Sequence, residues 1–381
     1  MGLTQTQEQN QATIRPFEPG DTDGFLDLYE AVWGRRKSAE WFEWRFEANP
    51  YVDEVPMVVA DADGQLAGAE PCVVFPLAVG DETVIAFQPA DWMVHPDHRR
   101  RGLFTRMTER LLEDYADGPE SCYYNFPSDA IMPGLKKLGW QEIGTVPTYY
   151  RIQDVERLAG ARLSTDRLAA KGMLAIGQAG LSLARGVSSL TSLGGPSEYT
   201  VERHETVPAE TLVQLYESGV PDRVHIRRDE AFYNWRFGNP RWETTTYLAK
   251  ADGGVVASVI AATSDDEDLR RVWVLDTLPA DGSAPADSYE ALLSAVVEDG
   301  ADADVLKCCG APMPATVLGR CGFRPDDEFP LSSLSSRTKA VVRAPTPEDG
   351  DPVGREPWLG AGVDPTDGGA WAVQLCGRDV A

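Results

Sequence analysis

The sequence has 381 residues, of which 43% are hydrophobic and 25% charged, a composition typical of globular protein. This length suggests two or three domains. No apolar run approaches the roughly 18 residues that a membrane span requires, and the polar start of the chain lacks the apolar segment of a signal peptide. These features exclude a membrane-embedded protein and predict a cytoplasmic one.

The formal net charge is −25, and 60 acidic residues stand against 35 basic ones, of which seven are lysines. Because the acidic residues are spread along the whole chain, they are typical of a folded protein that works in high salt, where self-repulsion is screened. We therefore expect a halophilic source. The acidic surface also argues against nucleic acid or an anionic membrane as a partner.

The cysteines form no C-x-x-C pair, and the four histidines lie outside metal-ligand spacing to them. In a cytoplasmic protein such cysteines are expected to be reduced, mostly buried thiols. We predict neither a structural metal nor a disulfide framework. The six cysteines are Cys72, Cys122, Cys308, Cys309, Cys321 and Cys376.

Hydrophobic patterning predicts a mixed α/β domain over residues 12–152, after a disordered tail at 1–11. Its hairpin-rich first half and alternating second half indicate a mixed sheet flanked by helices. The expected strands are 14–16, 56–61, 66–79, 82–95, 122–126 and one from residue 140. The expected helices are 21–33, 39–47, 102–115 and 129–138.

An internal repeat divides the chain. Trp44-Arg45-Phe46 is followed by Asn49-Pro50, a strand and an Asp-Gly turn, and Trp235-Arg236-Phe237 is followed by the same series at nearly the same spacing. A period of about 190 residues indicates duplication of a whole domain rather than a solenoid. Because both copies carry Arg45 or Arg236, we favour a structural role for this arginine over a catalytic one.

The duplication predicts a second domain over residues 198–340. Residues 153–197 are expected to form interdomain helices and a linker. Residues 341–381 form a tail rich in Pro, Gly and Asp, with a candidate final strand at 371–375.

One basic segment carries the chemistry. A strand runs to Pro96, Arg99-Arg100-Arg101 follow, and a helix begins near Gly102. The first amides of a helix have no internal partner, and a glycine allows close approach, so such a loop can cradle a phosphate. The alternative is a solvated basic turn before an ordinary helix.

This segment resembles the acetyl-CoA loop of the GNAT superfamily, Q/R-x-x-G-x-G/A, in its leading Arg99 and its Gly102. It departs at Phe104, where a small residue is usual. The tandem layout also resembles the enhanced-intracellular-survival type of acetyltransferase. The resemblance implies acetyl-CoA or another acyl-CoA as co-substrate, and no metal. The residues that it implies for cofactor binding are Met93, Val94, Arg99, Arg100, Arg101, Gly102, Leu103, Phe104 and Asn125.

The implied reaction is direct attack of an amine on the thioester, which needs a base for the ammonium. Asp91, His95 and Glu70 are the candidate bases, and a water chain is an alternative. The family often supplies a tyrosine as acid at the position that Leu135 occupies here. Tyr124, or its neighbour Tyr123, is the candidate substitute.

The second copy lacks the basic loop, so we expect it to have lost the cofactor. The predicted function is therefore acyl transfer to a small-molecule or peptide amine, without nucleic acid or membrane as partner. Two alternatives stay open: a non-catalytic CoA-binding or scaffold protein, and an aminoacyl transferase with a tandem GNAT-like fold. The acceptor and the oligomeric state cannot be derived from the sequence.

Overall fold

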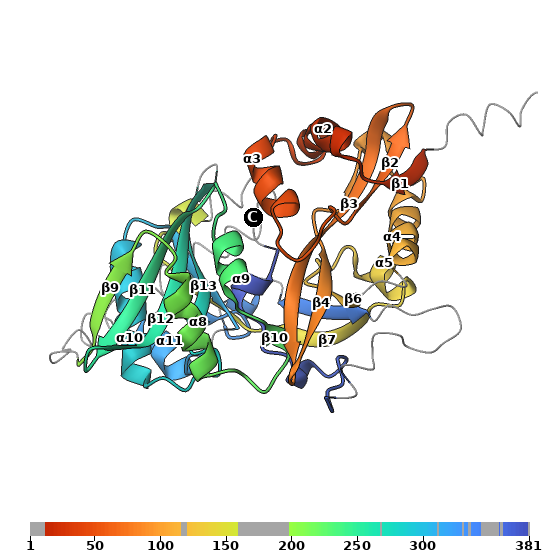
Figure 1. Cartoon of the computed structure of the whole chain (residues 1–381). Helices are drawn as coiled ribbons and strands as arrows, with labels where there is room; N and C mark the ends of the chain where they lie inside the picture. Colours follow the sequence, from red (N-terminus) through yellow and green to blue (C-terminus); the bar gives the residue numbers. More distant parts are fainter. Residues whose placement is uncertain are drawn as a thin grey trace, which may run out of the picture.

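The computed structural model describes most of the chain in nine stretches. The described residues are 12–115, 120–158, 198–266, 269–310, 312–329, 331–333, 337–343, 358 and 361–379. The expected tail at 1–11 and most of the expected linker lie outside them. The described residues form two sheets that lie side by side, each with helices on its faces (Figure 1).

The first sheet has the strand order β1-β2-β3-β4-β6-β16-β7, with β5 and β10 also paired to β3. All its pairs are antiparallel except β4 with β6. Its strands are β1 (Thr13–Pro16), β2 (Met57–Ala62), β3 (Gln65–Val79), β4 (Glu82–Pro89), β5 (Met93–Val94), β6 (Glu120–Asn125), β7 (Gln141–Val146), β10 (His225–Ile226) and β16 (Thr338–Arg343).

The second sheet has the order β15-β8-β14-β13-β12-β11-β9, with only β13 and β14 parallel. Its strands are β8 (Thr148–Ile152), β9 (Thr200–His204), β11 (Glu243–Ala251), β12 (Gly254–Asp266), β13 (Leu269–Leu278), β14 (Val305–Cys309) and β15 (Arg324–Pro325). The parallel pair occupies the same place in both sheets, as duplication requires.

The two copies exchange one strand each. β8 follows β7 in the chain but pairs with β14 and β15 in the second sheet. β16 follows β15 but lies between β6 and β7 in the first sheet. The ranges expected for the two domains, 12–152 and 198–340, therefore each contain residues that belong to the other sheet. Each sheet is complete only with a strand from the other half of the chain.

The helices repeat between the copies. The first copy has α2 (Thr22–Trp33), α3 (Ala39–Phe42) continued by the π-helix η2 (Glu43–Glu47), α4 (Leu103–Asp114) and α5 (Met132–Lys137). The second has α8 (Ala209–Ser218), α9 (Glu230–Arg236), α10 (Ala286–Asp299) and α11 (Ala315–Arg320). Short 3-10 turns are η1 (Pro19–Asp21), η3 (Pro96–His98), η4 (Leu331–Ser333), η5 (Gly368–Ala370) and η6 (Leu375–Gly377).

Three hydrophobic cores hold these layers. The buried stripe of α4, with Leu103, Met107 and Leu111 at helical spacing, packs on one face of the first sheet. Helix α10 packs in the same way on the second sheet. The largest core lies between the sheets and joins α2 and α3 of the first copy to α8 and α9 of the second. The two copies therefore share a core.

Local sequence signals match the structure closely. The turns at Asp63-Gly64 and Asp252-Gly253 both have positive φ at their two residues, as the tight hairpins predicted from Asp-Gly require. The candidate final strand at 371–375 is not a strand: Trp371 makes one isolated bridge to Val224, and η6 begins at Leu375. Among the residues that the structure describes, the last strand is β16.

Candidate functional site

The first sheet opens between β4 and β6. Their parallel pairing reaches Phe87 opposite Tyr123 and then ends. The side-chain amide of Asn125 spans the opening: it donates to the carbonyl of Pro89 at 2.7 Å and accepts from the amide of Phe126 at 2.7 Å. Asn125 is buried. It therefore fixes how far the two strand ends stand apart.

Beyond this point the chain leaves β4 through a bulge and resumes as β5. Met93 and Val94 pair with Ala69 and Gly68 of β3. Among the described strands, β3 is the only partner of β5. The edge of β5 that faces the opening thus has no strand beside it, although Arg99 Nε donates to the carbonyl of Val94 at 3.3 Å. An extended amide-bearing ligand can pair with such an edge.

The basic loop leads from β5 into α4. Gly102 is the N-cap residue of α4, with φ of 73°, and a Cβ placed on it would meet open space. The first hydrogen bond of the helix runs from the amide of Arg106 to the carbonyl of Gly102, so the amides of residues 103–105 precede it. These amides are the ones that bind a phosphate at a helix N-terminus.

The three arginines of this loop are exposed. Within the described part of the chain, no carboxylate forms an ion pair with Arg99, Arg100 or Arg101. Arg100 has a φ of 63°, which a non-glycine residue rarely adopts. Three guanidinium groups without this kind of ion pair, beside open helix amides, fit a pyrophosphate, in a chain whose net charge is −25.

Phe104 does not obstruct this loop. Its ring packs edge-on against Trp92, with 5.5 Å between ring centroids, and lies against Gly134 of α5. The bulky side chain therefore fills the space between α4 and α5, while its amide stays at the helix N-terminus.

Asp91 lies in the bulge between β4 and β5, on the opposite side of the sheet opening from α4. Its φ is 45°, a strained value for a residue with a side chain. Its carboxylate forms an ion pair with Arg45 at 3.1 Å, and Arg45 also pairs with Asp379. Burial raises the pKa of Asp91 to about 6, against the opposing effect of Arg45, and the negative charge of Asp379 adds to the rise. A carboxylate with this pKa can accept a proton near neutral pH.

Glu70, another candidate base, faces the other way. It is fully buried under α4 and accepts a hydrogen bond from Thr108 Oγ1 at 2.7 Å. Burial raises its pKa to about 8. A pKa raised in this direction favours the protonated, neutral form of Glu70 in the core.

The structure gives His95 and Tyr124 local partners. Nδ1 of His95 accepts from the amide of Asp97 at 3.3 Å, which caps η3. The hydroxyl of Tyr124 is buried and donates to the carbonyl of Gly377 at 2.9 Å. Burial raises the pKa of Tyr124 far above its usual value. Both side chains hold the backbone near the site: the hydroxyl of Tyr124 is used inside the core, whereas His95 uses only its Nδ1.

The C-terminal segment passes between the two copies, close to α3 and α9 (Figure 1). Arg236, the counterpart of Arg45, donates to the carbonyls of Cys376 and Arg378 at 2.8 and 3.0 Å. Arg45 pairs with Asp379. The arginines of the repeated motif thus both bind this segment, which supports their structural role and places Asp379 beside Asp91.

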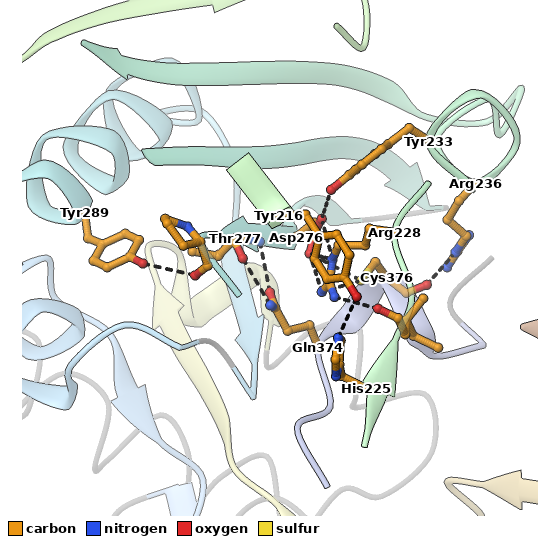
Figure 2. A network of polar contacts seen from close by, with 12 residues as sticks. Tyr216, His225, Arg228, Tyr233, Arg236, Asp276, Thr277, Tyr289, Gln374 and Cys376 are labelled. Atoms are coloured by element: carbon orange, nitrogen blue, oxygen red, sulfur yellow. Dashed lines mark hydrogen bonds and ion pairs between the residues drawn. The ribbon is translucent and has the colours of Figure 1, made fainter. Parts of the chain in front are cut away.

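In the second copy, the segment occupies the corresponding opening. The parallel pairing of β13 and β14 ends at Val274 opposite Cys308. Just beyond, the amide of Thr277 donates to Gln374 Oε1 at 2.9 Å, and Gln374 Nε2 donates to the carbonyl of Thr277 at 3.1 Å (Figure 2). A side-chain amide of the protein itself thus pairs with the strand edge that the first copy leaves open.

The turn before α10 also differs from the basic loop of the first copy. The carboxylate of Asp281 accepts from the amide of Ser283 at 2.9 Å. A carboxylate therefore lies in the turn that corresponds to the basic loop of the first copy, and its charge would repel a phosphate. The second copy has neither the basic loop nor an open strand edge.

Sequence reasoning missed three residues that the fold brings to these sites: Lys37, Gln374 and Asp379. None lies in a motif; Gln374 lies in the candidate final strand at 371–375, and Asp379 lies at the end of the tail expected over residues 341–381. In the described residues, no three His, Cys, Asp or Glu side chains gather into a group that could hold a metal ion. No described helix combines the length and the apolar character needed to cross a bilayer.

Comparison with known proteins agrees with this geometry. Residues 13–143 match the family described as acetyltransferase (GNAT) domain. The first copy is therefore similar in sequence to a GNAT acetyltransferase domain, and the duplicated architecture has a tandem GNAT-like fold. No curated protein matches the chain in sequence.

Solved structures share the fold over most of the chain. A GCN5-related N-acetyltransferase from Anabaena variabilis ATCC 29413 is 10% identical, with a TM-score of 0.57, over 88% of this chain and 73% of its own. One from Kribbella flavida is 15% identical, with a TM-score of 0.55, over 88% and 72%. A tandem GNAT protein from the clavulanic acid biosynthesis pathway is 13% identical, with a TM-score of 0.56, over 89% and 100%. At these identities the likeness shows the fold alone.

Proposed function

We propose that this protein transfers an acetyl or other acyl group from acyl-CoA to an amine, at one site in the first copy. The observation that carries the proposal is the basic loop: three exposed arginines, with no carboxylate partner among the described residues, lie beside the free amides at the start of α4, next to an edge of β5 that no other described strand covers. Acyl-CoA supplies the thioester, and no metal is needed for direct attack by an amine.

In this proposal, different residues of the first copy bind the cofactor, set the width of the opening and accept the proton. The loop from Arg99 to Phe104 binds the pyrophosphate, and Met93 and Val94 pair with the pantetheine arm. Asn125 holds the opening at the width set by its bond to Pro89. Asp91 accepts the proton of the acceptor ammonium, because its buried carboxylate has a pKa of about 6 and lies at the bulge beside β5.

The second copy is proposed to bind no cofactor, since Gln374 occupies the edge of β13. In this proposal the second copy has three roles. Its strands β14 and β15 pair with β8, its residues anchor the C-terminal segment, and its surface forms one wall of the acceptor site. The six cysteines are buried and form no disulfide, and together with the acidic surface they support a cytoplasmic protein from a salt-rich cell.

The experiment that tests this proposal is calorimetric titration of acetyl-CoA into the purified chain in molar potassium chloride. We expect one-to-one binding that an Arg99→Glu/Gly102→Glu variant loses. Arg110→Glu, which changes a half-buried arginine further along α4, is the charge control and should bind normally.

Other outcomes would contradict the proposal in distinct ways. Two molecules bound per chain would overturn the assignment of a single site. No binding by the folded wild-type protein would overturn the acyl-CoA assignment itself.

A further inference from the structure

A basic residue precedes the N-cap of the motif helix in both copies. Lys37 is followed by Ser38, whose side chain caps α3, and Arg228 is followed by Asp229, whose side chain caps α9. Lys37 lies seven positions before Trp44 (44 − 37), and Arg228 lies seven before Trp235 (235 − 228). The two basic residues are therefore equivalent.

In the second copy this basic residue has a carboxylate partner. Arg228 donates to Asp276 through Nε at 3.1 Å and through Nη2 at 2.8 Å, and both residues are almost completely buried. Tyr233 donates to the same carboxylate at 3.3 Å (Figure 2). Asp276 lies beside a bulge in β13, as Asp91 lies in the bulge of the first copy. The buried cation of the second copy, Arg228, is thus neutralised by a carboxylate of the same copy.

In the first copy the equivalent cation lacks such a partner. Lys37 is 5% exposed, and its Nζ has no hydrogen-bond partner. It lies 4.7 Å from the ring centroid of Trp41 and 5.5 Å from that of Tyr29. Asp91 cannot replace Asp276 here, because it is paired with Arg45. A buried ammonium without an anion is costly, so its persistence calls for an explanation.

The electrostatics around Lys37 favour an anion. Burial lowers the pKa of Lys37 to about 8, and the positive charges of Arg241, Arg35 and Arg45 lower it further, while Asp91 opposes them. In an acidic chain this is a local excess of positive charge. This positive charge lies on the same side of the sheet opening as Asp91, and α4 and the basic loop lie on the other side. The Asp91 side is the one from which an acceptor can approach the thioester.

We propose that Lys37 binds a carboxylate of the acceptor, so that the substrate is an amine that also carries a carboxylate, as amino acids and short peptides do. The acceptor would supply the anion that Asp276 supplies in the second copy. The flexible four-carbon stem lets the ammonium turn from the face of Trp41 toward the entering carboxylate. Asp91, close by, would then face the acceptor's ammonium. This inference rests on the proposed acyl transfer.

The test uses matched acceptors that differ only in the carboxylate. The wild-type chain is assayed with acetyl-CoA and, for each of several amino acids, with the free acid, the carboxamide and the decarboxylated amine. We expect measurable transfer to free acids and a KM at least about tenfold higher for their neutral analogues, the factor typical of one charge-assisted hydrogen bond. Acetyl-CoA binding is measured separately by calorimetry.

Variants of Lys37 assign the effect to this residue. Lys37→Met should raise KM about 10- to 100-fold for the free acids and leave KM for the carboxamides within about twofold. Lys37→Arg, which installs the residue that the second copy uses, should restore most of the preference. Equal effects of Lys37→Met on acids and carboxamides would overturn the inference.

The assays of the wild-type protein with free acids, carboxamides and amines also test the carboxylate inference without any variant. Transfer to carboxamides and simple amines as good as to free acids overturns the carboxylate inference while leaving acyl transfer intact. Bound acetyl-CoA without transfer to any free acid overturns it as well. Failure to bind acetyl-CoA overturns the proposed function instead.

Discussion

Trp44 and Trp235 each donate the indole N–H to the other's backbone carbonyl, and both bonds measure 2.8 Å. The two residues are 191 positions apart and occupy equivalent places in the two copies. The bonds therefore form a reciprocal pair across the shared core. The exchange of β8 and β16 adds a second reciprocal link, so that neither sheet is complete without the other half of the chain.

This arrangement predicts a single cooperative unfolding unit. Trp44→Phe keeps most of the aromatic packing but leaves a buried carbonyl without its donor. We expect it to lower the unfolding free energy by about 1–3 kcal/mol without splitting the transition. Urea unfolding in high salt, followed by both fluorescence and circular dichroism, measures this. Two separated transitions would show that the copies unfold independently.

Much of this fold could be predicted from the sequence, because its signals are local. The Asp-Gly turns and the apolar stripe of α4 depend on neighbouring residues, and the structure has both where expected. The strand exchange could not be predicted. β8 and β16 are ordinary strands by composition, and the choice of their partners depends on contacts made across the whole chain.

In the candidate site, too, local features could be predicted from the sequence and contacts between distant residues could not. The basic loop is contiguous in sequence and was therefore visible as a motif. The partner of Arg45 is not: Asp379 lies 334 positions away. Lys37 is only seven positions from Trp44, but nothing in its local sequence shows that its ammonium is buried without an anion. Only the comparison with Arg228 in the folded second copy reveals this.

The proposed role of Asp91 predicts a pH dependence. Because its pKa is raised to about 6, the carboxylate is protonated below that pH and the rate of acetyl transfer should fall tenfold per unit there. Asp91→Asn should lower kcat by about 10²- to 10⁴-fold, the usual contribution of a general base. His95→Gln serves as the comparison and should keep the wild-type profile. A loss of less than tenfold in Asp91→Asn would favour a water chain as the base.

Glu70 predicts a pH effect on stability rather than on rate. Its pKa in the fold is about 8, above the ordinary value of 4.5, and burial is the main cause. Because the fold binds this proton more tightly than the unfolded chain does, the contribution of protonated Glu70 to stability is complete below about pH 4.5. That contribution is lost as the pH rises through 8.

A Glu70→Gln variant isolates this effect, since it keeps an acceptor for Thr108 without an ionisable group. We expect the wild type to lose on the order of 4 kcal/mol more than this variant between pH 5 and pH 9. Urea unfolding of both proteins at the two pH values gives the difference. Parallel losses would show that Glu70 does not retain its proton in the core.

The contrast between Lys37 and Arg228 predicts opposite effects of the same substitution. Arg228→Met removes one partner of a buried ion pair and leaves Asp276 without its cation, which should destabilise the protein by about 3–5 kcal/mol. Lys37→Met removes a buried cation that has no carboxylate partner, so at pH 7 it should raise the unfolding free energy by about 1–3 kcal/mol. Chemical unfolding of the two variants side by side, without acceptor, measures both changes. A site that is kept ready for an anion lowers the stability of the protein until that anion binds, so removing Lys37 should relieve the cost. If Lys37→Met instead destabilised the protein as strongly as Arg228→Met, Lys37 would be an ordinary structural residue.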